Sequence, residues 1–96
     1  MRYLIVTCLA LLPGATLAAN PDCEVMGGIV DKIVAERVEG TEMMAAMETV
    51  AADYTGDQER FVGTIPHLTD WVYNGLPEEH LTAEAGQAFA TQCAAQ

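Results

Sequence analysis

The chain has 96 residues, of which 51% are apolar, and it carries 14 Asp and Glu against four Lys and Arg, a formal net charge of −10. This length allows one small domain. The acidic balance speaks against nucleic acid and anionic membrane surfaces as partners, because both attract basic patches.

Residues 1–18 have the three-part pattern of a secretory signal peptide. Arg2 supplies one positive charge, an apolar run follows over 4–12, and small residues lead up to a cleavage site after Ala18. The run is shorter than the about 20 residues that cross a bilayer, which disfavours the alternative of a retained anchor helix. We therefore expect one domain over 19–96 that is periplasmic or secreted and makes no membrane contact after signal removal.

Cys23 and Cys93 are the cysteines left in the exported domain, since Cys8 lies in the predicted signal. Small exported domains often add a disulfide to a marginal core. The alternative, a reactive thiol pair, usually has the close spacing C-x-x-C, which is absent. We predict a disulfide that closes a loop of 93 − 23 = 70 residues. In the chain-entropy model it stabilises the fold by about 4 kcal/mol.

The first helix is predicted to begin with Asn20 as N-cap and Pro21 at the first helical position. Apolar residues then recur every three or four positions, as on one stripe of an α-helix. This stripe consists of Val25, Met26, Ile29, Val30, Ile33, Val34 and Val38. Gly27 and Gly28 would let another helix approach closely, and Gly40 is expected to end the helix as a C-cap.

A second helix is predicted from the cap Thr41 to a stop at Gly56. Its helical spacing is carried by Met43, Met44, Met47, Val50, Ala51 and Tyr54. The methionines have two readings. They pack into the core at helical spacing, or they form an adaptable apolar surface for a partner.

A third segment is predicted from the cap Asp57, with one apolar face made by Phe61, Ile65, Leu68 and Val72. Pro66 lies inside this pattern, and proline removes a helical hydrogen bond and clashes with the preceding turn. We therefore expect a kink or two short helices that restart near Pro66. Asn74 and Gly75 predict a turn or a left-handed cap.

The chain ends in a short turn after Pro77 and a last helix capped by Thr82. Ala85, Phe89 and Cys93 share one face at a spacing of four residues, so the last helix should pack against the first. No segment shows the two-residue alternation of a strand. The predicted fold is all-α, a compact bundle of four to five short helices closed by one disulfide.

The sequence carries no recognisable catalytic or cofactor motif. It contains no Ser, which excludes a Ser-His-Asp triad, and oxidised cysteines cannot act as nucleophiles. His67, Asp70 and His80 lack metal-ligand spacing such as H-E-x-x-H. We expect a protein that is not an enzyme, with no catalytic residues, no metal and no cofactor.

Binding to an unknown protein partner is the remaining class of function. Trp71 and Tyr73 flank Val72, so if Val72 is buried, at least one of these aromatic residues is partly exposed. Exposed aromatic side chains are typical contact residues. The candidate contact residues are Trp71, Tyr73, His67, Met43, Met44 and Met47.

Five residues carry a resemblance: Cys23, Arg37, Gly40 and Met43, in the spacing C-x13-R-x2-G-x2-M, and a closing Cys93. The chain resembles a group of small uncharacterised exported proteins of Gram-negative bacteria with this pattern. The resemblance implies a helical, disulfide-closed periplasmic protein and no particular activity.

A weaker similarity is to the acid-activated periplasmic chaperones of the HdeA type, which are also small, exported, helical and closed by one disulfide. It implies an alternative function, in which the apolar core is exposed to clients when carboxylates are protonated. We expect first a non-enzymatic protein that acts through protein–protein interaction, and second an acid-stress chaperone.

Overall fold

The computed structural model describes residues 21–95, and the predicted signal peptide and Asn20 lie outside the described residues. Residues 21–95 are helical and contain no strand, which confirms the predicted all-α fold. Three of the segments are short 3₁₀ or π helices, written η. The elements are α3 (Pro21–Val38), α4 (Met43–Ala51), η1 (Gly56–Thr64), α5 (Ile65–Asp70), η2 (Trp71–Gly75), η3 (Glu78–His80) and α6 (Ala85–Ala94).

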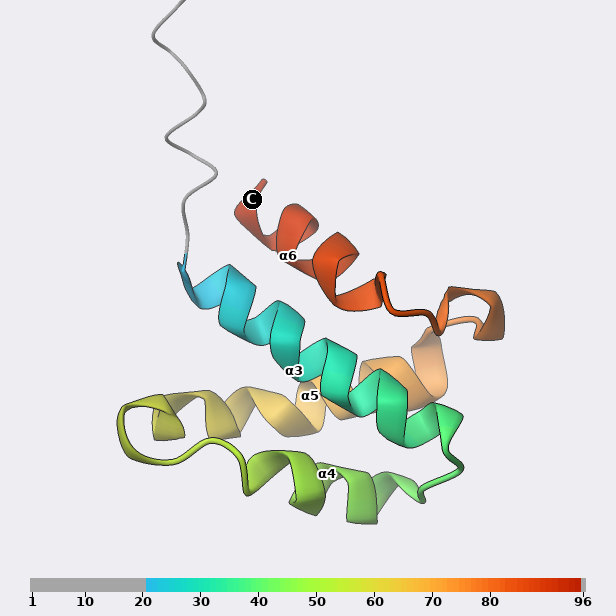
Figure 1. The fold of residues 1–96 in the computed structure, drawn as a ribbon, viewed down its shortest axis with the longest axis horizontal. Helices are drawn as coiled ribbons and strands as arrows, with labels where there is room; N and C mark the ends of the chain where they lie inside the picture. Colours follow the sequence, from blue (N-terminus) through green and yellow to red (C-terminus); the bar gives the residue numbers. More distant parts are fainter. Residues whose placement is uncertain (1–20, 96) are drawn as a thin grey trace, which may run out of the picture.

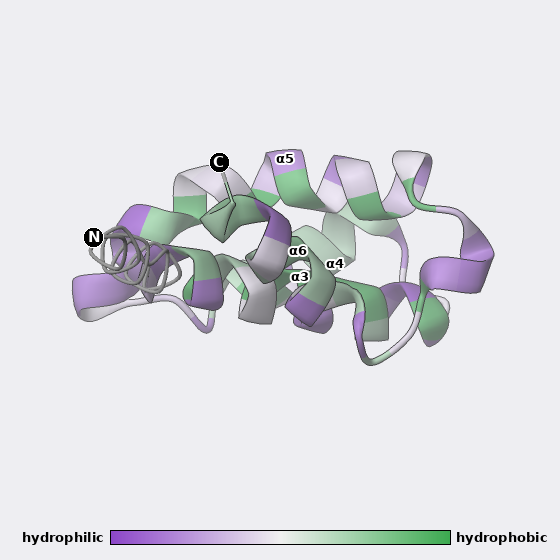
Figure 2. Ribbon diagram, turned by 90° about the horizontal axis from the view of Figure 1, so that it is seen from above, coloured by the Kyte–Doolittle hydropathy of each residue, from purple (hydrophilic) through white to green (hydrophobic). Residues whose placement is uncertain are grey.

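The helices form two layers around α3, the longest helix. In one layer α3 lies between α6 on one side and α4 on the other (Figure 1). The continuous run η1–α5–η2 crosses α3 as the second layer (Figure 2). Because α3 contacts both α6 and η2, it fixes how these two elements face each other.

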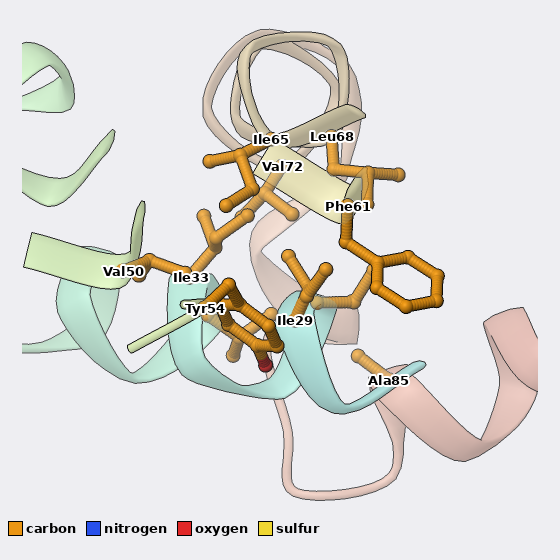
Figure 3. Packing of buried hydrophobic residues seen from close by; sticks show 11 residues of the cluster. Ile29, Ile33, Val50, Tyr54, Phe61, Ile65, Leu68, Val72 and Ala85 are labelled. Atoms are coloured by element: carbon orange, nitrogen blue, oxygen red, sulfur yellow. The ribbon is translucent and has the colours of Figure 1, made fainter. Parts of the chain in front are cut away.

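The core lies between the two layers. Figure 3 shows Ile29 and Ile33 of α3 beside Ile65 and Val72 of the second layer, and all four are at most 1% exposed. The core cluster is Ile29, Val30, Ile33, Val34, Val50, Tyr54, Phe61, Ile65, Leu68, Val72 and Ala85. The predicted apolar faces are therefore confirmed, except at Met44, which is 56% exposed, and at Val38. Val38 is 64% exposed, because it is the last residue of α3 and projects beyond the core cluster.

The C-terminal end of α3 has the form of a Schellman motif. Gly40 has a φ of +88°, which glycine adopts without steric cost. The N–H of Thr41 donates to the carbonyl of Glu36 at 2.9 Å, and the N–H of Gly40 donates to that of Arg37 at 3.0 Å. The prediction of Gly40 as the C-cap is confirmed.

Helix α4 is capped one residue later than predicted. The N-cap is Glu42, whose side chain accepts hydrogen bonds from the N–H groups of Met44 and Ala45. The prediction of Thr41 was wrong because the backbone of that residue completes the Schellman motif instead.

The third segment divides at the proline, as predicted. The 3₁₀ run η1 changes to α-helix at Ile65, and Pro66 lies in the first turn of α5, where a missing N–H costs no helical hydrogen bond. Asp57 is not the cap, since the N-cap position of η1 is Thr55 without a side-chain hydrogen bond. The left-handed alternative at Gly75 is also wrong, because the segment continues there as the π turn η2.

Helix α6 begins at Ala85, later than the predicted cap at Thr82 implies. The hydroxyl of Thr82 accepts from the N–H of Glu84 at 3.2 Å in the preceding turn. The first turn of α6 is capped from α3 instead, since the N–H of Gly86 donates to the Asp31 carboxylate at 2.8 Å. The short turn predicted after Pro77 is present as the 3₁₀ helix η3.

Candidate functional site

A tight junction between α3 and α6 supports the candidate site. Cys23 and Cys93 form a disulfide with a Cα–Cα distance of 5.6 Å, as predicted. Near the other end of α6, Gly27 faces Gly86 so closely that a Cβ atom on Gly27 would lie 2.6 Å from the carbonyl oxygen of Gly86. Close approach was predicted for both Gly27 and Gly28, but no atom lies within 4 Å of a Cβ placed on Gly28.

An open groove of about 530 Å³ lies where α6 faces η2 and η3, and we call it the Trp71 groove. The rings of Trp71 and Phe89 have centroids 5.9 Å apart and are tilted by 50°. Most of the groove surface is apolar. Trp71 is 38% exposed, so part of its ring is open to solvent in the groove. The lining residues are Trp71, Leu76, Glu79, His80, Thr82, Glu84, Ala85, Ala88, Phe89 and Gln92.

Arg37 of α3 holds the wall of the groove that carries the tryptophan. Its guanidinium donates hydrogen bonds to the carbonyl oxygens of Val72 and, at 3.0 Å, of Leu76. The last carbonyls of a helix lack partners within the helix, so a cation at this position satisfies them and complements their partial negative charge. The arginine in the C-x13-R pattern therefore positions η2.

Tyr73 points away from the groove. Its hydroxyl donates to the carbonyl of Thr41 at 2.7 Å, which ties η2 to the connection between α3 and α4. Burial raises the pKa of the Tyr73 hydroxyl above its usual value, and the negative charge of Glu36 adds to the rise. Of the two aromatic residues around the buried Val72, Trp71 is exposed and Tyr73 is partly buried.

The remaining predicted contact residues do not gather at the groove. His67 is exposed on α5 and does not line the groove, whereas His80, which was not predicted as a contact, does. Asp70 accepts a hydrogen bond from the Asn74 amide at 2.7 Å. No group of three His, Cys, Asp or Glu side chains within residues 21–95 is arranged to hold a metal ion.

The methionines lie in a different place. Met44 and Met47 line a small hollow of about 170 Å³ between α4 and the run η1–α5. Met47 packs against the core, Met44 is 56% exposed, and the sulfur of Met43 lies 3.9 Å from the Asn74 amide nitrogen. The core-packing interpretation of the methionines is therefore confirmed for Met47, whereas Met44 lies on the surface and its contact with a partner stays a prediction.

Each Lys and Arg side chain within residues 21–95 has an internal partner. Lys32 lies 3.2 Å from Asp53, Arg60 forms two hydrogen bonds with Asp22, and Arg37 donates to two backbone carbonyls, one in η2 and one directly after it. The hydrogen bond from Arg60 lowers the pKa of Asp22. Partial burial works to lower the pKa of Lys32, but hydrogen bonds with Asp53 and Tyr54 outweigh it and raise that pKa.

The charge of the Trp71 groove is consequently one-sided. Glu79 and Glu84 lie in its lining, both are exposed, and no Lys or Arg of the described chain lines it. The lining therefore combines apolar residues around Trp71 and Phe89, which we call the floor, with the exposed carboxylates of Glu79 and Glu84, which we call the acidic rim.

No helix in the part of the chain that the structure describes has the length and apolarity needed to cross a membrane. Comparison with known proteins gives no match: no family model, curated protein or solved structure is similar to this chain.

Proposed function

We propose that this chain is an exported, non-enzymatic protein that binds a protein partner through the Trp71 groove. The observation that carries the proposal is the groove itself, about 530 Å³ of mostly apolar surface with Trp71 and Phe89 side by side. Tryptophan is enriched among the residues that dominate binding energy at protein interfaces.

The walls of the groove are held in place before any partner binds. The disulfide and the Gly27–Gly86 contact fix α6 on α3, and Arg37 fixes the end of η2 on the same helix. Binding to such a surface needs little ordering of the backbone, which lowers the free-energy cost of association. The disulfide also supports an oxidising compartment such as the periplasm.

The charge balance does not favour the alternative of an acid-stress chaperone. Signal removal takes away Arg2 and leaves three Lys and Arg against 14 acidic residues, a net charge of 3 − 14 = −11. Protonation of the carboxylates removes this negative charge and leaves a small positive one, so charge repulsion inside the fold falls in acid. Lowering the pH to 2 while following Trp71 fluorescence and client aggregation tests this alternative, and client protection in acid would support it.

The proposal is tested with two lysine substitutions on neighbouring exposed positions of α6. Ala88 lines the groove and Gln87 does not, so Ala88→Lys obstructs the groove while Gln87→Lys adds the same charge outside it. The oxidised protein and both variants are immobilised and exposed to periplasmic extract of the source cell. We expect a partner that the wild type and Gln87→Lys retain and Ala88→Lys loses. Equal retention by both variants, or no retained protein, would overturn the proposal.

A further inference from the structure

We infer that the Trp71 groove binds a cationic amphipathic helix, whose apolar face lies on Trp71 and Phe89 and whose Lys or Arg residues lie beside Glu79 and Glu84. The inference rests on the proposed function and specifies the chemistry of the partner segment. The inference is based on the combination of the apolar floor and the acidic rim in one groove.

The floor of the groove suits the apolar side chains of a helix. Large side chains that are three or four residues apart lie on the same face of a helix and enter a groove together. Leu76, Ala85 and Ala88 extend the apolar lining around the aromatic pair, and alanines leave room for a neighbouring helix to approach. An aromatic or aliphatic anchor from the partner would contact the exposed part of Trp71.

The rim of the groove selects the charge of this helix. Glu79 of η3 and Glu84, which directly precedes α6, are exposed in the lining, and Glu78 precedes Glu79 in η3. The whole exported domain adds to this negative potential, because it has three Lys and Arg against 14 Asp and Glu, a net charge of 3 − 14 = −11. Such a potential steers a cationic segment toward the groove and repels an acidic one.

A second copy of this chain is a poor occupant for the same reason. Two copies would each bring a net charge of −11, and neither has a Lys or Arg of residues 21–95 without an internal partner to place against the other's carboxylates. The groove surface is therefore matched to a partner of opposite charge, not to itself.

The test uses synthetic helices and the fluorescence of Trp71, the single tryptophan of the chain. The probe is a Lys/Leu amphipathic peptide of about four helical turns. One matched peptide has Glu at every Lys position, and another has Ser at every Leu position. We expect the Lys/Leu peptide to bind at least about tenfold more tightly than either matched peptide, and binding to weaken as salt is raised.

Variants locate the binding. Ala88→Lys should weaken the Lys/Leu peptide about tenfold or more, and Gln87→Lys much less. Glu79→Gln with Glu84→Gln should weaken binding several-fold. The charge-matched pair Glu39→Gln with Glu59→Gln, which lies outside the groove, should leave the dissociation constant close to that of the wild type.

The outcomes separate this inference from the proposed function. Equal binding of the Lys/Leu and Glu/Leu peptides, or no binding of either, overturns the inference about charge. If the wild type retains a protein from the extract and Ala88→Lys does not, the groove remains the docking site for a partner of other chemistry. Self-association that Ala88→Lys abolishes, measured by light scattering, would instead assign the groove to a second copy.

Discussion

Alanine at two adjacent glycines of α3 should change stability in opposite directions. Alanine is favoured over glycine by about 1 kcal/mol inside a helix. No atom lies within 4 Å of a Cβ on Gly28, so Gly28→Ala should raise the free energy of unfolding by up to about 1 kcal/mol. At Gly27 the same methyl group would lie 2.6 Å from the carbonyl oxygen of Gly86 and 3.1 Å from Cβ of Ala90.

The backbone carbonyl of Gly86 cannot rotate away as a side chain could, and the disulfide ties the other end of α6 to α3. Overpacking of this kind costs about 1–3 kcal/mol, which exceeds the gain in helix propensity. We therefore expect Gly27→Ala to lose about 1 kcal/mol and to lie about 2 kcal/mol below Gly28→Ala.

The measurement is urea unfolding of the oxidised domain, followed by far-ultraviolet circular dichroism. In thermal unfolding the two variants should differ by roughly 10 °C, since 1 kcal/mol shifts the midpoint of a domain this small by about 4–8 °C. Gly86→Ala tests the facing position and should also destabilise, because its Cβ would meet the carbonyl of Gly27 and the Asp31 carboxylate. The reasoning is refuted if Gly27→Ala is as stable as Gly28→Ala.

Three further outcomes are expected. Replacing Cys23 and Cys93 with Ala should lower the free energy of unfolding by about 4 kcal/mol, since their link closes 70 residues; an unchanged urea midpoint would contradict this. Arg37→Met keeps the aliphatic stem but leaves two carbonyls of the η2 end without their donor, which should cost about 1–3 kcal/mol and shift Trp71 fluorescence, with Arg37→Lys losing less. Burial raises the pKa of the Tyr73 hydroxyl, so the stability that its protonated form contributes is present below about pH 10 and is lost as pH rises through the raised pKa. Tyr73→Phe should reduce this loss of stability at alkaline pH, which urea unfolding at increasing pH measures.

The parts of the fold that were predictable from sequence depend on local periodicity. The stripe of α3 and the face from Phe61 to Val72 follow from helical spacing alone, because each face must be buried somewhere. The division at Pro66 follows from the geometry of one residue. The disulfide was predictable because Cys23 and Cys93 are the two cysteines outside the predicted signal peptide, and because the apolar faces of the first and last helices were expected to pack together.

The contacts that build the site were not predictable, because their partners are distant along the chain. Asp31 caps α6 across 55 residues, although its place in the sequence resembles that of an exposed helical carboxylate. Arg37 reaches carbonyls 35 and 39 residues away, and periodicity contains no information about such partners. The prediction of Thr82 as a cap was wrong for this reason, since the cap of α6 comes from another helix.

The three Lys and Arg side chains of the described chain connect its stability to the proposed binding. Arg37 ties η2 to α3, Arg60 ties η1 to the start of α3 through Asp22, and Lys32 ties α3 to the turn after α4 through Asp53. Each of these three side chains thus links two elements of the fold. None of them lines the Trp71 groove, whose charged lining residues are the carboxylates of Glu79 and Glu84. An arginine or lysine added at the rim would weaken the negative potential of the groove, so the scarcity of basic residues that limits internal ion pairs is also what the proposed selectivity for a cationic partner requires.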